Sequence, residues 1–167
     1  MVIRKRKFIL AFTCFVLFSS AGAIAHAEDF VSFDPVPQHP PSEEIFAVNI
    51  VIEAKKYLGT LYKFGGTTPT GFDCSGFVRW VYQQFDFSLP RTAREQAAIG
   101  EEISPGDLQV GDILVFKAGR TGYHTGIYVG DDRFIHSPGR GKRIREANMK
   151  IGIFANKLIS VRRLILK

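Results

Sequence analysis

The chain has 167 residues, with 22 Lys and Arg against 16 Asp and Glu and a formal net charge of +6. This length suits one ordinary domain and argues against two. Four of the basic residues form a cluster at positions 4–7, which leaves 18 basic against 16 acidic residues in the rest of the chain. Such a balance excludes the strongly basic character of a nucleic-acid-binding protein.

Residues 1–27 have the three parts of a secretory signal peptide. The basic cluster is followed by a mainly apolar run from Phe8 to about Phe18, and then by small residues that end in Ala25-His26-Ala27. The apolar run is shorter than the roughly 20 residues that span a bilayer. We expect cleavage after residue 27, export to the periplasm or the cell exterior, and no stable membrane span afterwards. A retained N-terminal anchor and lipid modification of Cys14 are the alternatives.

Residues 28–41 are predicted to form an extended linker, because four prolines stand there among polar residues. Residues 42–167 are predicted to form one catalytic domain that begins with helices. Ser42 is a suitable helix N-cap, and two acidic residues follow it in the first turn. Apolar residues at spacings of four, three and four predict a helix that ends at Gly59. This stripe consists of Ala47, Val51, Ala54 and Leu58.

A Gly-rich loop leads to a second predicted helix, which begins at Asp73 or Cys74 and ends near Phe85. Thr92 and Glu95 form the capping-box pattern of a short third helix. Beyond Gly100 the apolar periodicity becomes that of β-strands. Strands are predicted at residues 112–117, 123–129, 133–137 and 158–166, and a hairpin turn at residues 130–132. Helices followed by antiparallel strands indicate an α+β domain.

Signal-peptide cleavage would leave Cys74 as the one cysteine of the mature chain, which then has no internal disulfide. A lone thiol is unusual in an exported protein, although a buried cysteine that packs as a small apolar residue is the simpler alternative. Cys74 stands where a Gly-rich loop enters a helix, and unpaired N–H groups and the helix dipole favour a thiolate there. We therefore expect a lowered thiol pKa and stabilisation of an oxyanion by the same N–H groups.

Three histidines remain in the mature chain, and His39 lies in the linker, where it is a poor candidate for a catalytic base. His124 begins one strand of the predicted hairpin and His136 ends the other. A three-residue turn would place Gly126 opposite His136 and both histidines on one face, whereas a two-residue turn would separate them unless a bulge restored the register. On one face, His124 would take the proton of Cys74 and His136 would orient His124. A zinc site made by the three residues is the alternative, although a closely spaced ligand pair is missing.

Six stretches of the chain, taken in order, resemble the NlpC family of cell-wall cysteine endopeptidases. They are Tyr62-Lys63-Phe64-Gly65-Gly66, Phe72-Asp73-Cys74-Ser75-Gly76-Phe77-Val78, Leu89-Pro90-Arg91-Thr92, Gly111-Asp112-Ile113-Leu114-Val115-Phe116, His124-Thr125-Gly126-Ile127-Tyr128-Val129-Gly130 and Arg133-Phe134-Ile135-His136. The resemblance extends over about residues 45–165. It implies a papain-like fold in which N-terminal helices pack on a C-terminal antiparallel sheet.

The resemblance also implies a role for particular residues. Cys74 would be the nucleophile, His124 the base and His136 the third catalytic residue. Three further residues would contact the substrate, namely Tyr62, Asp73 and Ser75. For Asp73, a plain helix N-cap is the alternative role. No cofactor or metal is implied, because the thiolate supplies the nucleophile.

Peptidoglycan stem peptides are the substrate and partner that the resemblance implies. Cleavage would fall next to a diamino acid such as meso-diaminopimelate, at either the γ-D-glutamyl bond or the D-alanyl cross-link. We expect a monomeric, wall-associated enzyme with no nucleic-acid partner. An inactive wall-binding protein and an acyl transferase are the competing hypotheses. Residues 140–167 carry nine Lys and Arg and one acid, which suits either the anionic wall or a plain solvated face.

Overall fold

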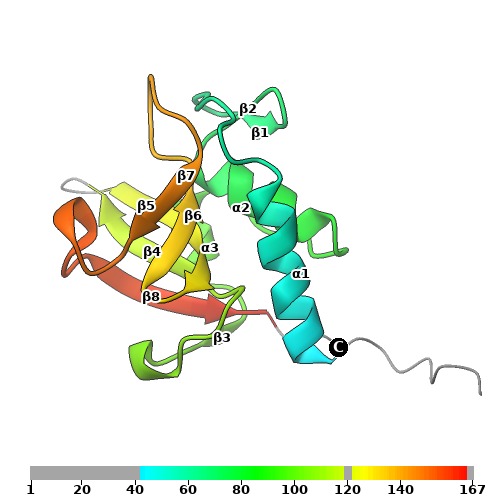
Figure 1. The fold of residues 1–167 in the computed structure, drawn as a ribbon, viewed down its shortest axis with the longest axis vertical. Helices are drawn as coiled ribbons and strands as arrows, with labels where there is room; N and C mark the ends of the chain where they lie inside the picture. The colour runs from blue at the N-terminus through cyan, green and yellow to red at the C-terminus, as the bar shows by residue number, and fades with distance from the viewer. Residues whose placement is uncertain (1–41, 119–121, 165–167) are drawn as a thin grey trace, which may run out of the picture. The chain divides into compact units, whose positions relative to one another are not determined.

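The computed structural model of the protein describes residues 42–118 and 122–164 (Figure 1). The expected signal peptide, its cleavage site, the linker and Cys14 lie outside these residues. No helix in the described part is long and apolar enough to cross a membrane. Its helices are α1 (Glu43–Lys55), α2 (Cys74–Gln83), α3 (Ala93–Gln96) and the short 3-10 helices η1 (Pro105–Asp107) and η2 (Gly152–Phe154).

The main sheet has six antiparallel strands in the order β3-β8-β4-β5-β6-β7, and β1 and β2 form a separate pair. Figure 1 shows α1 and α2 on one side of the main sheet. The predicted α+β architecture is therefore confirmed, although the short strands β1, β2 and β3 and strand β7 were not predicted. The strands are β1 (Thr67–Thr68), β2 (Gly71–Phe72), β3 (Glu101–Glu102), β4 (Ile113–Ala118), β5 (Gly122–Gly130), β6 (Arg133–His136), β7 (Arg145–Asn148) and β8 (Leu158–Arg163).

Both faces of the sheet are covered by apolar side chains, and β4 contributes to both. Ile113 and Val115 pack into the cluster formed with α1 and α2, whereas Leu114 and Phe116 pack into a second cluster with Phe154 of η2. Side chains alternate between the two faces of a strand, so an uninterrupted apolar run is what a central strand with two covered faces requires.

The predicted start of α1 is confirmed, because the side chain of Ser42 accepts a hydrogen bond from the Ile45 N–H. The predicted stripe is wrong at its last residue. The helix ends at Lys55, so Leu58 follows in a turn and is 43% exposed. The short helix α3 begins with the predicted capping box of Thr92 and Glu95.

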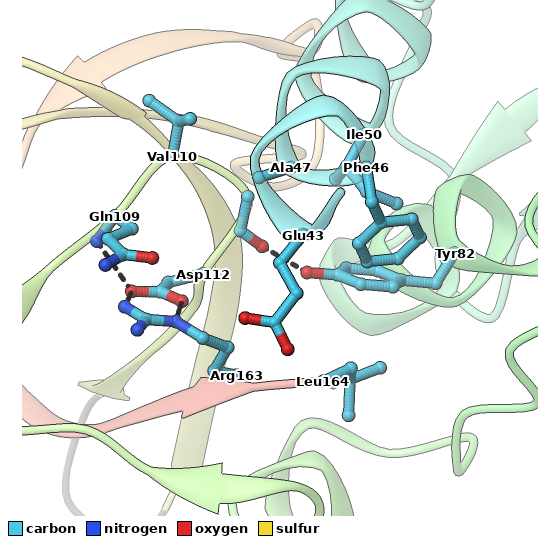
Figure 2. A pocket seen from close by; sticks show the side chains of 11 residues that line it. Glu43, Phe46, Ala47, Ile50, Tyr82, Gln109, Val110, Asp112, Arg163 and Leu164 are labelled. Carbon is cyan, nitrogen blue, oxygen red and sulfur yellow. Dashed lines mark hydrogen bonds and ion pairs between the residues drawn. The ribbon is translucent and has the colours of Figure 1, made fainter. Parts of the chain in front are cut away.

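Two buried polar contacts connect α2, the start of β4 and the end of β8, as Figure 2 shows. The hydroxyl of Tyr82 in α2 donates to the carbonyl of Gly111. Arg163 donates from Nε and Nη2 to the two oxygens of Asp112, each at 2.8 Å. The carboxylate of Asp112 is 2% exposed, so this bidentate pair supplies the partners that a buried charge needs. These contacts hold the helices against the strands that lead to the site.

Candidate active site

Cys74 is the first residue of α2, and Asp73 determines where that helix begins. The Gly76 N–H donates to Asp73 Oδ1 at 2.7 Å, which is the N-cap bond. Gly76 lies so close to the preceding loop that an added Cβ would be 2.0 Å from the carbonyl oxygen of Gly66. This close approach seats the helix start against the loop and leaves the Cys74 side chain half-buried at the predicted position.

Opposing influences act on the thiol of Cys74. Burial is the largest of them and raises the pKa of the thiol, and the negative charge of Asp73 raises it further. Backbone N–H groups of Thr125, Ser75 and Cys74 itself act in the opposite direction and lower the pKa. The expected lowered pKa is wrong, because desolvation of the thiolate outweighs the helix N-terminus. The effect of the Thr125 backbone on the thiol indicates that the sulfur faces β5, at the residue that follows His124.

The β5–β6 hairpin brings the two histidines together. Its turn has two residues, Asp131 and Asp132, whose φ angles of 51° and 56° are typical of a type I′ turn. The predicted three-residue turn is therefore wrong. However, a bulge in β5 beside the turn adds one residue to that strand. The resulting register brings Gly126 opposite His136, so that His124 and His136 share one face.

The histidine rings are in direct contact. His124 Nε2 lies 2.7 Å from His136 Nδ1, which leaves His124 Nδ1 as the nitrogen available to the thiol. Phe154 packs against both rings, with centroid distances of 5.7 Å and 5.1 Å to His124 and His136. The apolar ring therefore helps to fix the orientation of the two histidines.

Burial keeps both histidines neutral at pH 7. It lowers the pKa of His124 to about 4. The pKa of His136 falls to about 3, first through burial, then through repulsion from His124 when that ring is protonated, and then through the positive charges of Arg145 and Lys142. The resting state is therefore a neutral thiol beside a neutral imidazole. Such a pair transfers its proton during attack on a carbonyl rather than before it.

Polar side chains other than the histidines also act on the thiol. Burial raises the pKa of the Tyr62 hydroxyl, and the negative charges of Cys74 and Asp73 raise it further, so Tyr62 stays a hydrogen-bond donor. Asp73 is held by Arg91, whose Nη1 and Nη2 donate to its two oxygens at 3.1 Å and 2.5 Å. Arg91 Nη1 also donates to Ser75 Oγ at 3.1 Å.

Arg91 and Gln96 belong to this site although the sequence analysis gave neither a role. Gln96 is fully buried, and its Nε2 donates at 3.0 Å to the carbonyls of Ser75 and Pro90, which ties the start of α2 to the segment before α3. Arg91 lies in the Leu-Pro-Arg-Thr stretch, so the resemblance marked the position. Its ion pair with Asp73 joins residues 18 positions apart, a distance over which no local pattern reveals a contact.

No group of three or more His, Cys, Asp or Glu side chains in residues 42–118 and 122–164 is arranged to hold a metal ion. The fold and the site together define an α+β domain with a cysteine at a helix start and a histidine pair on an antiparallel sheet. Residues 59–163 match the NlpC/P60 family, and the chain belongs to that family.

Two curated relatives and one solved structure illustrate the similarity. The chain is 41% identical over 120 residues to the gamma-DL-glutamyl hydrolase of Bacillus subtilis, covering 70% of this chain and 29% of the relative. It is 45% identical over 80 residues to the murein DD-endopeptidase MepS/murein LD-carboxypeptidase of Escherichia coli, covering 47% and 43%. The NlpC/p60 domain of the peptidoglycan hydrolase SagA superposes with a TM-score of 0.63 at 34% identity, covering 71% of this chain and 98% of that domain.

Proposed function

We propose that the protein is an exported cysteine endopeptidase that hydrolyses amide bonds in the stem peptides or cross-links of peptidoglycan. Two observations carry the proposal: the thiol of Cys74 lies at a helix N-terminus facing Thr125, the residue after His124, and His124 and His136 are joined at 2.7 Å. Relatives that act on glutamyl and murein bonds support the substrate class.

In the proposed acylation step, Cys74 Sγ forms a bond to the carbonyl carbon of the scissile amide while its proton moves to His124 Nδ1. His136 Nδ1 accepts a hydrogen bond from His124 Nε2–H and so stabilises the imidazolium. The C–N bond then breaks, and His124 gives the proton to the leaving amine. Both groups are neutral at rest, so all charge separation occurs within the site, where preorganised donors are most effective.

The oxyanion of this step would be held by backbone and side-chain donors. The Cys74 and Ser75 N–H groups lie at the start of α2, where a helix has no internal acceptor for them, and the Tyr62 hydroxyl is a third donor. In deacylation, His124 takes a proton from water and the resulting hydroxide attacks the thioester carbon. The C–S bond then breaks, His124 returns the proton to the sulfur, and the acid product leaves and loses its own proton to solvent.

Two substrate-binding roles follow from the contacts of Arg91. Asp73 already accepts hydrogen bonds from the Gly76 N–H, the Gly65 N–H and Arg91, so we propose that it positions Arg91 and the loop rather than binding substrate through its own oxygens. Ser75 and Tyr62 then contact the acyl part of the substrate. Residues 1–27 act as the signal peptide in this proposal, and the mature monomer works at the wall, in the periplasm or outside the cell.

Digestion of purified peptidoglycan by the mature protein tests the proposal, with mass spectrometry of the released fragments. Cleavage should be abolished by Cys74→Ala and reduced by at least about 10³-fold by His124→Ala. The His136→Ala variant should retain more activity, because its residue acts through His124. Surface variant Lys55→Gln is the control. Unchanged fragments with wild-type protein on walls of different chemistry would overturn the proposal.

The bond that is cut is determined with defined peptides. One peptide contains the γ-D-glutamyl bond to a diamino acid, and a second contains the D-alanyl cross-link. The names of the two relatives above refer to different bonds. Cleavage of only one of the two peptides would therefore show which bond this protein cuts. Transfer of the acyl group to an added amine instead of water would identify the protein as an acyl transferase, and binding without turnover would identify it as a wall-binding protein.

A further inference from the structure

A second cavity lies next to the histidine pair and plays no part in the mechanism above. Its volume is about 200 Å³. His124 and His136 lie in its wall, whereas Cys74, Tyr62 and Asp73 do not. It is formed where the ends of β4, β6 and β7 meet the segment around η2. The remaining lining residues are Lys117, Ala118, Pro138, Lys142, Arg145, Ile153, Phe154 and Lys157.

The wall of this cavity is strongly basic. Lys117, Lys142, Arg145 and Lys157 contribute four positive charges, and no acidic side chain from residues 42–118 or 122–164 lines the cavity. Among the ion pairs of the described residues, none involves these four side chains. The fold holds two of them together, since the Lys117 N–H donates to the Lys157 carbonyl at 2.8 Å. Like charges gathered around a hollow attract an anion.

An apolar surface adjoins the charges. Phe154 is 9% exposed and Ile153 is 65% exposed, and both line the cavity with Pro138. A ligand that fits this wall has a short aliphatic stem and an anionic end. A bare inorganic anion would leave the apolar part uncovered, and a ligand with a free ammonium end would be repelled by the lysines.

The position of the cavity relates it to one half of the substrate. The leaving amine takes its proton from His124, so the leaving half of the substrate must lie on the histidine side of the thiol. The acyl half lies on the other side, beside Tyr62 and Ser75. The cavity is on the histidine side, because His124 lines it and the acyl-side residues do not.

We propose that this basic cavity binds a free carboxylate of the residue on the leaving side of the scissile bond, and so selects a carboxylate-bearing diamino acid over one that ends in an amine or an amide. The inference rests on the proposed peptidase function. Lys142 and Arg145 are the primary contacts, since both line the cavity together with His136, and Ile153 and Phe154 contact the aliphatic stem.

Carboxylate binding has a second consequence, because the cavity and the histidines interact electrically. The charged groups that face His136 are His124, Arg145 and Lys142, and all three lower its pKa. A bound carboxylate offsets the last two charges and thereby favours the imidazolium that forms when Cys74 attacks. The buried His136 Nε2 has no hydrogen-bond partner in the described residues.

The test uses two synthetic stem peptides that differ only in the diamino acid on the leaving side, which carries a carboxylate in one and a carboxamide in the other. Wild-type kcat/KM should fall by about tenfold or more on amidation, the usual range for a charge-assisted hydrogen bond. The variant Lys142→Gln/Arg145→Gln should cut both peptides within about threefold of each other. Both side chains are exposed, so the variant should fold, which circular dichroism checks.

The control Lys55→Gln removes a distant surface charge and should keep the full discrimination. Equal cleavage of both peptides by wild type, or undiminished discrimination by the double variant, would overturn the inference and leave the proposed peptidase function intact. If neither peptide is cut, calorimetry with the Cys74→Ala protein still decides the point. Tighter binding of the carboxylate peptide supports the cavity assignment, and equal binding refutes it.

Discussion

The buried, neutral histidine pair should make the protein lose stability when the pH falls from 7 to 4. In the unfolded chain His124 takes up a proton near its ordinary pKa of 6.5, whereas in the folded protein its pKa is about 4. Between these values the unfolded state binds more protons, so stability decreases as the pH decreases. The difference corresponds to about 3 kcal/mol for the first proton on the pair. His136 has a pKa of about 3, so it adds a loss of similar size over the same pH range, which continues to lower pH.

Urea unfolding at pH 7, 6, 5 and 4 measures this effect, with the variant His124→Gln/His136→Gln as the reference. Carboxylates also affect the pH dependence, but they are common to both proteins, so the difference between the two curves isolates the histidines. Wild type should lose about 5–6 kcal/mol more than the variant between pH 6.5 and 4, because each of the two histidines contributes about 3 kcal/mol. Parallel curves would mean that the histidines titrate near 6.5 and would refute the neutral pair.

Three further substitutions test the supports of the site. Gly126→Ala would place a Cβ 2.8 Å from a β6 carbonyl oxygen, so it should cost about 1–3 kcal/mol in urea unfolding and reduce activity; wild-type stability would contradict the close approach. Arg163→Met leaves the buried Asp112 carboxylate without its partner and should cost about 3–5 kcal/mol, whereas the control Arg162→Met should cost under about 1 kcal/mol. Arg91→Lys keeps the charge but loses the bidentate geometry, so KM should rise several-fold in peptide assays; an unchanged KM would exclude the proposed positioning role.

Local sequence signals predicted the parts of the fold that depend on neighbours in the chain. The helix starts at Ser42 and Thr92 were readable because a capping side chain bonds to a backbone N–H within three residues. Strand β4 was readable from its apolar run. Strand β7 was not, because Arg-Glu-Ala-Asn has no β-branched or aromatic residue. It is a strand because β6 pairs with it, which is a tertiary cause.

The sequence predicted the candidate site to a similar extent. Residue types and order pointed to Cys74, His124 and His136, and the turn register was recognised as the condition for their meeting. The bulge that meets this condition left no distinct sequence signal, because its effect depends on how two strands pair. The thiol pKa was misjudged for a related reason. A helix N-terminus can be read from the sequence, but the burial that opposes it arises from packing against β5.

The neutral resting state changes where catalytic power must come from. An ion pair formed before substrate binds would place the cost of charge separation in the free enzyme, and the histidine would then need a pKa above the working pH. Here burial holds the pKa of His124 at about 4 and raises that of Cys74, so proton transfer from sulfur to nitrogen is uphill without substrate. Attack on the carbonyl makes the transfer favourable only if the new oxyanion and imidazolium are both stabilised at that moment. The helix N–H groups stabilise the oxyanion, and His136 stabilises the imidazolium. A substrate carboxylate bound in the basic cavity would stabilise the imidazolium further. The identity of the leaving residue would thereby affect the rate of acylation.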